Sequence, residues 1–222
     1  PKSYFPKVQK VLEKYDVLLV ADEVICGFGR TGNMWGSETF SIRPDIVTAA
    51  KALSSAYLPI SAVIISEKVY GPIKDQANEL GIFGHGYTYS AHPVCAAVAM
   101  KAQQIMIDRN IIANVKQLSK LFNERIQNIK NNSWFLSHSR SVGLIGAVEF
   151  GYEGNKKFDI KNKIAAKCAK IIQENGVILR ALPGDIIGFC PPLIIKEEQI
   201  NEMFDKIDIA FKNFDEMAFN LK

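Results

Sequence analysis

Two short apolar runs, each ending abruptly in charged residues, constrain this chain more than any other feature. Residues 17–21 are apolar and lead into Asp22 and Glu23, and residues 46–50 are nearly all apolar and lead into Lys51. Uninterrupted apolar runs are typical of strands covered on both faces, as in a parallel sheet with helices on either side. Functional groups in such sheets gather at the carboxyl ends of the strands. We therefore expect Asp22 and Lys51 to converge at one edge of a sheet.

Position alone leaves two interpretations of Lys51 open. A lysine at the end of a strand usually reaches into solvent. A lysine withdrawn from water has a lowered pKa, and the neutral amine is the form that attacks an aldehyde to make a Schiff base. Asp22 is equally ambiguous, because a carboxylate after a strand is commonly a helix cap or a loop residue. Each residue is a weak signal by itself, and the two together suggest a site.

Longer segments around these residues resemble one known family. The hexapeptide 19–24 (Leu-Val-Ala-Asp-Glu-Val), the loop 27–32 (Gly-Phe-Gly-Arg-Thr-Gly) and the stretch 44–55 are similar to class III, pyridoxal-phosphate-dependent aminotransferases. The similarity continues in the same order through 84–93, 177–180, 190–195 and the last helix. It covers essentially the whole chain and is strongest to the omega-aminotransferase (amine:pyruvate) branch.

The resemblance implies a function for several residues. Lys51 would form the internal aldimine with pyridoxal 5'-phosphate, and its freed amine would then move a proton between the substrate carbon and the cofactor. Asp22 would pair with the pyridine nitrogen and keep it protonated, so that the ring acts as an electron sink. Val24 would pack on one face of the ring. Thr88 would bind the cofactor phosphate, donated across a dimer interface from the other subunit.

Arg180 is the substrate-binding residue that the resemblance implies. In the omega branch, an arginine at this position folds in to hold a substrate carboxylate through two hydrogen bonds and swings away for a bulky amine. We expect it to end a short strand, 177–179. Gly184 and Asp185 downstream would give its loop freedom to move.

The fold class that the resemblance implies is α/β, fold type I of the pyridoxal-phosphate-dependent transferases. Residues 1–108 would be the C-terminal part of the large mixed or parallel-sheet cofactor domain, and residues 109–222 the small α+β C-terminal domain. The spacing of apolar residues along the sequence also predicts where the helices and strands lie. The predicted strands cover 17–21, 46–50, 61–66, 143–150, 177–180 and 186–189. The predicted helices cover a short segment from Glu67, 93–108, 110–130, 160–175 and 196–219.

Composition excludes several other classes of function. The chain has 222 residues and a formal net charge of +4, with no basic patch interleaved with aromatic residues that would indicate nucleic-acid binding. It has no apolar stretch near 20 residues and no signal-peptide pattern, so we expect no membrane association and a cytoplasmic location. The histidines are not spaced as metal ligands and the cysteines form no Cys-x-x-Cys pair, so no metal is implied.

The chain begins at Pro1, directly upstream of the strand that carries Asp22. Compared with the family, it lacks roughly the N-terminal half, which supplies the phosphate-binding turn and the aromatic residue that stacks on the cofactor ring. We therefore expect a fragment of a longer enzyme, with little or no activity in isolation.

The expected reaction is transfer of an amino group from an amine or amino acid to a 2-oxo acid such as pyruvate. The resemblance implies a homodimer with the active site at its interface. Two alternatives remain open. One is another class III reaction, that of an aminomutase or a decarboxylating transaminase. The other is a catalytically inactive fragment that only dimerises.

Overall fold

The computed structural model describes residues 2–153 and 155–222, and the chain divides into two compact units, Pro1–Ile112 and Ala113–Lys222. The division falls within the first turn of helix α5 (Ile111–Asn131), whereas the sequence places the boundary after Asp108. None of the helices among the described residues combines the length and the apolar character needed to cross a lipid bilayer.

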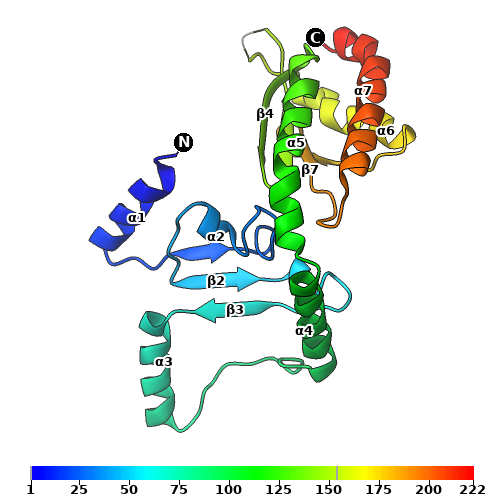
Figure 1. Cartoon of the computed structure of the whole chain (residues 1–222). Coiled ribbons are helices and arrows are strands. Elements are labelled where there is room, and N and C mark those ends of the chain that lie inside the picture. Colours follow the sequence, from blue (N-terminus) through cyan, green and yellow to red (C-terminus); the bar gives the residue numbers. More distant parts are fainter. Residues whose placement is uncertain (1, 154) are drawn as a thin grey trace. The chain divides into compact units, whose positions relative to one another are not determined.

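The first unit contains a small mixed sheet (Figure 1). Strands β1 (Val20–Asp22) and β2 (Ile46–Ala49) are parallel, with Asp22 opposite Thr48, and β3 (Ala62–Ile65) is antiparallel to β2. The mixed sheet predicted from the sequence is therefore confirmed. The other elements of this unit are α1 (Tyr4–Lys14), α2 (Gly36–Thr39), the 3-10 turn η1 (Lys51–Leu53), α3 (Glu67–Leu80) and α4 (Pro93–Asp108).

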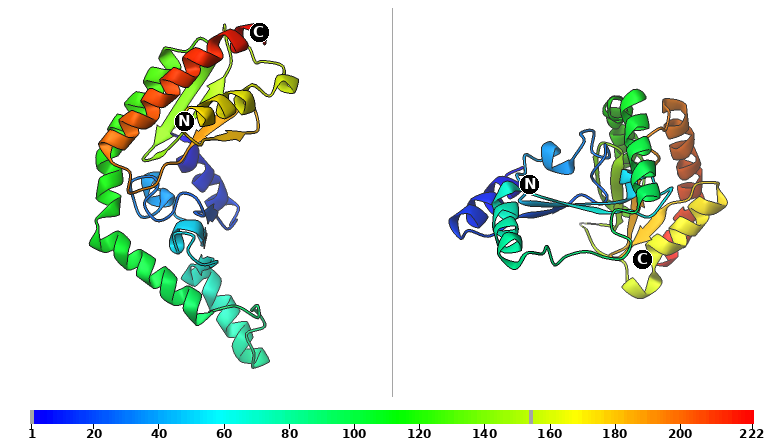
Figure 2. Two further views of the ribbon diagram at one scale, coloured as in Figure 1. Left: turned by 90° about the vertical axis from the view of Figure 1, so that its right-hand side faces the viewer. Right: turned by 90° about the horizontal axis from the view of Figure 1, so that it is seen from below.

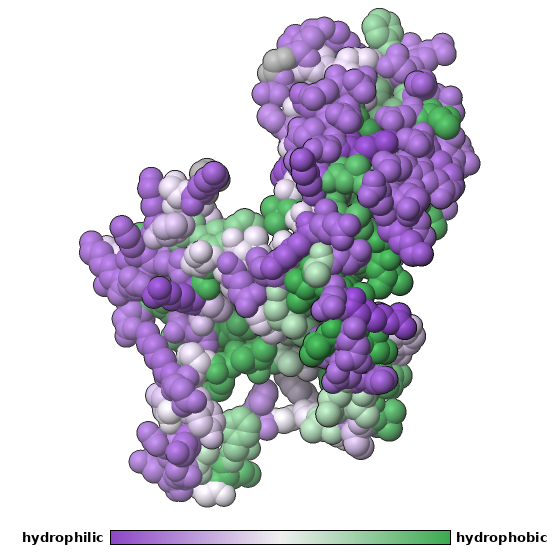
Figure 3. All heavy atoms as spheres, viewed as in Figure 1, coloured by the Kyte–Doolittle hydropathy of each residue, from purple (hydrophilic) through white to green (hydrophobic). Residues whose placement is uncertain are grey.

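The strands of the first unit are more exposed than their apolar sequences predict. Val20 is 53% exposed, Val63 67% and Ile64 47%. Helices α1 and α3 bury none of their own side chains fully. Figure 3 shows apolar residues, in green, at the surface of this unit. Cover on both faces was predicted for β1 and β2. Within the described chain β1 lacks it, since Val20 is exposed, whereas β2 is half-buried and its last residue, Ala49, is buried.

The second unit is built on a four-stranded antiparallel sheet with the order β4-β5-β7-β6 (Figure 2). Helices α5, α6 and α7 lie alongside these strands. The elements of this unit after α5 are β4 (Leu136–Val142), β5 (Ile145–Phe150), the 3-10 turn η2 (Ile160–Asn162), α6 (Ile164–Glu174), β6 (Arg180–Leu182), β7 (Ile186–Phe189) and α7 (Glu197–Asn220).

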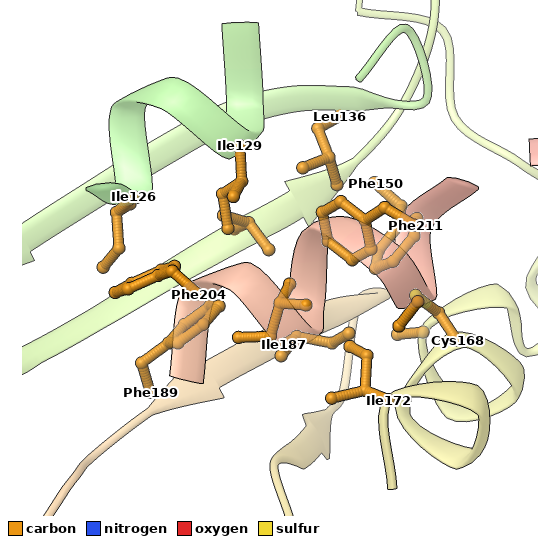
Figure 4. Packing of buried hydrophobic residues seen from close by; sticks show 14 of the residues in the cluster. Ile126, Ile129, Leu136, Phe150, Cys168, Ile172, Ile187, Phe189, Phe204 and Phe211 are labelled. Atoms are coloured by element: carbon orange, nitrogen blue, oxygen red, sulfur yellow. The ribbon is translucent and has the colours of Figure 1, made fainter. Parts of the chain in front are cut away.

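The core of the second unit lies between this sheet and its helices (Figure 4). Val148 and Phe150 of β5 and Ile187 and Phe189 of β7 are fully buried and alternate with more exposed residues, as in a sheet with one covered face. Phe204 of α7 stacks on Phe189 with ring centroids 5.7 Å apart. Each such apolar side chain contributes roughly 1.5–3 kcal/mol by its burial, so this unit is held by its own core.

Several elements differ from the sequence prediction. The helix predicted over 160–175 is divided at Lys163, whose φ is +48°, into η2 and α6. Strand β4 is missed because polar residues such as His138 and Arg140 occupy its exposed positions, which leaves no apolar run. Helix α1 is missed although its apolar residues recur at helical spacing. The strand predicted over 177–180 begins only at Arg180, because Ile178 is 83% exposed and no strand in the described part of the chain pairs with the residues before Arg180.

Candidate active site

Strands β1 and β2 end side by side, and each leads to one of the residues that the sequence singles out. Asp22 is the last residue of β1 and lies opposite Thr48 of β2, while Lys51 follows the end of β2 by two residues. The two arrowheads point the same way in Figure 1. Because parallel strands bring their carboxyl ends to the same edge of a sheet, a carboxylate and an amine lie at one edge of this unit.

The carboxylate of Asp22 is held in place by two hydrogen bonds. The Thr48 hydroxyl donates to Oδ1 over 3.2 Å, and the backbone N–H of Val24 donates to the same oxygen over 3.1 Å. Both bonds end on Oδ1, and the residue is exposed, so Oδ2 is the oxygen that would face a ligand. Sequence reasoning missed Thr48. The signal available was its place three residues before Lys51, in the strand expected beside that of Asp22.

Lys51 opens a turn with a strained backbone. Its φ is +45°, in the left-handed region that costs a residue with a Cβ roughly 1–2 kcal/mol. Its carbonyl accepts hydrogen bonds from the N–H groups of Ser54 and Ala56, and the buried Ser54 hydroxyl donates to the carbonyl of Leu58 over 2.7 Å. Lys51 itself is exposed in this chain.

Glu23 follows Asp22 directly but is a structural carboxylate. It is only 2% exposed, and its two oxygens accept hydrogen bonds from the backbone N–H groups of Gly36 (2.8 Å) and Ser37 (2.6 Å) at the start of α2. These contacts fix the loop 24–35, which leaves β1 immediately after Asp22. A Cβ on Gly36 would lie 2.8 Å from the Cβ of Cys26 and 3.0 Å from Glu23 Oε2, so glycine suits this close approach.

We expect Glu23→Gln to destabilise the first unit by about 1–3 kcal/mol. Glutamine keeps one acceptor oxygen, but its amide nitrogen would face a backbone N–H that has lost its partner. Unfolding in urea, followed by the fluorescence of Trp35 in a Trp134→Phe background, measures this change. Glu79→Gln, on the exposed surface of α3, is the control. A midpoint for Glu23→Gln equal to that of the control would contradict the structural assignment of Glu23.

Thr88 lies in an exposed turn between α3 and α4. The turn is closed by the Ser90 N–H, which donates to the Tyr87 carbonyl over 2.9 Å, and by the Tyr87 N–H, which donates to the Ser90 hydroxyl over 3.0 Å. Neither Gly84 nor Gly86 has a positive φ, and a Cβ on either would meet no atom within 4 Å. Nothing in the described part of the chain therefore requires glycine at these two positions.

Arg180 belongs to the second unit, where it is the exposed first residue of β6 and lies opposite Gly188. The freedom expected for the neighbouring turn stays a prediction, and the structure shows how the turn is built. Gly184 and Asp185 form a tight connection to β7 with φ values of +84° and +53°. The Asp185 carboxylate accepts a hydrogen bond from the N–H of Ala165 in α6 over 3.3 Å, which ties the turn to that helix.

A family model described as Aminotransferase class-III matches residues 1–211. The chain belongs to the class III aminotransferase family. This confirms the family that the sequence resembles, whose members depend on pyridoxal phosphate. The family assignment also confirms the α/β fold class of the transferases.

Curated relatives of this class III chain are named as aminotransferases. An uncharacterized aminotransferase of Sinorhizobium fredii is 42% identical over 216 residues, which are 96% of this chain and 46% of that protein. A probable mitochondrial gamma-aminobutyrate transaminase 2 of Oryza sativa subsp. indica is 42% identical over 224 residues, covering 100% of this chain and 45% of its own length. The chain thus spans about half the length of the curated relatives it matches.

Solved transaminases have the same fold. A transaminase structure with L-alanine superposes with a TM-score of 0.93 at 42% identity, over 98% of this chain and 51% of that chain. The omega transaminase of Pseudomonas jessenii in complex with PMP superposes with a TM-score of 0.93 at 38% identity, over 99% of this chain and 48% of that one. Arrangements like those of β1, β2 and η1 therefore exist in proteins whose titles name them transaminases.

Proposed function

We propose that this chain supplies Lys51 and Asp22 to the cofactor site of an aminotransferase that moves an amino group from an amine or amino acid to a 2-oxo acid such as pyruvate. One observation carries the proposal. Asp22, whose carboxylate is held on one oxygen, and Lys51 both stand at the carboxyl ends of the parallel β1-β2 pair in a chain of the class III family. The transaminase names of the relatives support the reaction class.

The residues present fit pyridoxal 5'-phosphate by their donor chemistry. Bound cofactor would supply an electron sink for the bonds of the substrate carbon. Asp22 Oδ2 would hold the proton on the ring nitrogen, and Val24 would pack against the ring. The Lys51 amine would hold the cofactor through its aldehyde carbon and, when free, would remove and return the proton of the substrate carbon. Thr48 would keep the Asp22 carboxylate in its orientation through its hydrogen bond.

The proposal includes a homodimer in which Thr88 binds the phosphate of the partner's cofactor. The support for this part of the proposal comes from the residues around Thr88. Thr88 is exposed between Tyr87 and Tyr89, which are 79% and 81% exposed. Gly84 and Gly86 have no packing reason within the described chain, and small residues allow a phosphate to approach the backbone.

The two units would correspond to parts of an aminotransferase, with residues 1–108 in the cofactor domain and 109–222 as the small C-terminal domain. We propose a cytoplasmic location on narrower support. Cys95, Cys168 and Cys190 carry free thiols, as is usual in a reducing compartment.

Arg180→Ala tests the proposed contact with a substrate carboxylate. We expect KM for a carboxylate-bearing substrate to rise about 10- to 100-fold, since a charge-assisted pair of hydrogen bonds is lost. An amine donor without a carboxylate serves as the internal control, and its KM should stay within about twofold because nothing in it pairs with the guanidinium. Steady-state kinetics of the variant with both donors makes this comparison. Equal rises for the two donors would exclude Arg180 as the carboxylate-binding residue.

Product analysis tests the reaction itself. The protein is prepared in the length that its gene encodes (the gene-encoded protein) and is incubated with pyridoxal phosphate, an amine donor and pyruvate. Alanine formed in equal amount to the donor consumed supports transamination. Carbon dioxide or an isomer of the donor would indicate a decarboxylating transaminase or an aminomutase instead. If no product forms with any donor, the result would support the alternative of a catalytically inactive protein.

A further inference from the structure

The side chain of Gln103, in the middle of α4, contacts the turn that carries Lys51. Its amide nitrogen Nε2 donates hydrogen bonds to the carbonyl oxygens of Ala52 (3.0 Å) and Leu53 (2.9 Å). A primary amide has two N–H donors, and here both end on consecutive carbonyls of one turn. The opposite orientation of the amide would place its oxygen against two carbonyl oxygens, so the contacts also fix which way the group points.

The hydrogen bonds from Gln103 reach carbonyl groups at the end of the turn 51–53. The carbonyls at the end of a short helical turn lack partners within the turn. The Ala52 carbonyl also accepts a bond from the Ser55 N–H over 3.2 Å, whereas the bond to the Leu53 carbonyl comes from Gln103. Lys51, directly before Ala52, has the left-handed φ of +45° and so depends on its surroundings to hold that conformation.

Helix α4 is a firm support for this contact. Its buried side chains, Ala99, Ala102 and Met106, lie at helical spacing on the face that packs into the first unit. Gln103 is half-buried beside them, and the end of β2 points towards this helix in Figure 1. A side chain anchored on a packed helix loses little further freedom when it binds the turn, so its two bonds constrain the turn effectively.

We infer that Gln103 is a positioning residue for Lys51. By fixing the peptide planes that follow Lys51, it fixes the direction from which the lysine amine is presented at the edge of the sheet. This inference rests on the proposed function of Lys51. Gln103 would act through its contacts with the turn 51–53.

Hydrogen exchange at the backbone amides of the gene-encoded protein, without cofactor, measures the local stability of the turn. In Gln103→Ala, we expect the amides of residues 53–57 to exchange about tenfold faster, because two hydrogen bonds that close the turn are absent. Gln103→Glu keeps the size of the side chain but places a carboxylate against two carbonyls, so it should show at least the same acceleration. Gln104→Ala is the matched control, since Gln104 is exposed and, among the described residues, its amide binds Asp108 on its own helix, over 2.7 Å.

A second measurement separates positioning from stability alone. Pyridoxal phosphate is added, the adduct is fixed with borohydride, and peptide mass spectrometry gives the rate at which the cofactor is attached to Lys51. We expect this rate to fall about tenfold in Gln103→Ala, in step with the looser turn, and to be unchanged in Gln104→Ala. The pH dependence of the absorbance of the bound cofactor should shift in the same variant only.

The outcomes distinguish the inference from the function on which it rests. Unchanged exchange at residues 53–57 in Gln103→Ala overturns the inference alone. Faster exchange with a normal rate of attachment and an unshifted absorbance titration reduces Gln103 to a structural residue and also overturns it. A wild-type protein that attaches the cofactor to lysines other than Lys51 overturns the proposed function, and with it any positioning by Gln103.

Discussion

Lys51→Ala is expected to lower kcat/KM for transamination by at least about 10³-fold in the gene-encoded protein, since it removes both the attachment point and the proton carrier. Loss of a general acid–base group alone costs about 10²- to 10⁴-fold. The backbone should be little affected, because alanine and lysine meet the same steric cost at the φ of +45°. Steady-state rates with an amine and pyruvate measure the loss. Borohydride fixation followed by mass spectrometry should find no cofactor on the peptide that contains residue 51.

Lys163→Ala provides a closely matched control. Lys163 is also exposed and also left-handed, with a φ of +48°, but it lies in the second unit at the start of α6. Any cost of replacing a left-handed lysine is thus present in both variants. Lys163→Ala should keep wild-type activity. Activity in Lys51→Ala above about a tenth of that in the control would show that Lys51 is not the catalytic lysine, since the general acid–base step alone predicts a larger loss.

Asp22→Asn should lower kcat about 10²- to 10⁴-fold while leaving the cofactor attached to Lys51. Asparagine keeps a side-chain oxygen for the hydrogen bonds from Thr48 and Val24, so the geometry at the end of β1 is retained. It lacks the negative charge that would hold a proton on the ring nitrogen, and the ring becomes a weaker electron sink. Rates with amine and pyruvate, together with the amount of bound cofactor, measure the two effects separately.

Asp16→Asn is the control for this substitution. Asp16 is an exposed carboxylate just before β1, paired with Lys68 over 2.7 Å, and it lies outside the proposed site. It should lose neither cofactor nor rate. If Asp22→Asn turns over as fast as Asp16→Asn, the carboxylate at the end of β1 does not act on the cofactor.

The edge of the sheet could be predicted from the sequence because its signals are local. Apolar runs mark the strands, and the charges that stop them mark the ends of those strands. Helix α4 was predicted with its observed limits because Pro93 begins it, a position that suits proline. The family motifs then added functions to Asp22 and Lys51 that position alone left undecided.

The contacts that hold the candidate site could not be predicted in the same way. The bond from Thr48 to Asp22 depends on the register of two strands, and that register is not written in either strand by itself. Gln103 is 51 positions from Ala52 and carries no local signal, since a polar residue in a helix usually faces solvent. The exposure of the strands in the first unit could not be predicted from the sequence either. The apolar sequence of β1 indicates cover on both faces, and the described chain does not supply that cover at Val20.

The uneven distribution of buried side chains has a consequence for aggregation. The large core lies in the second unit, whereas Val20, Val63 and Ile64 of the first unit stay exposed on their strands. Apolar strands at the edge of a sheet are the kind of segment that pairs with other chains or recruits chaperones. The unit that carries Lys51 is therefore the unit through which we expect this chain, taken by itself, to aggregate.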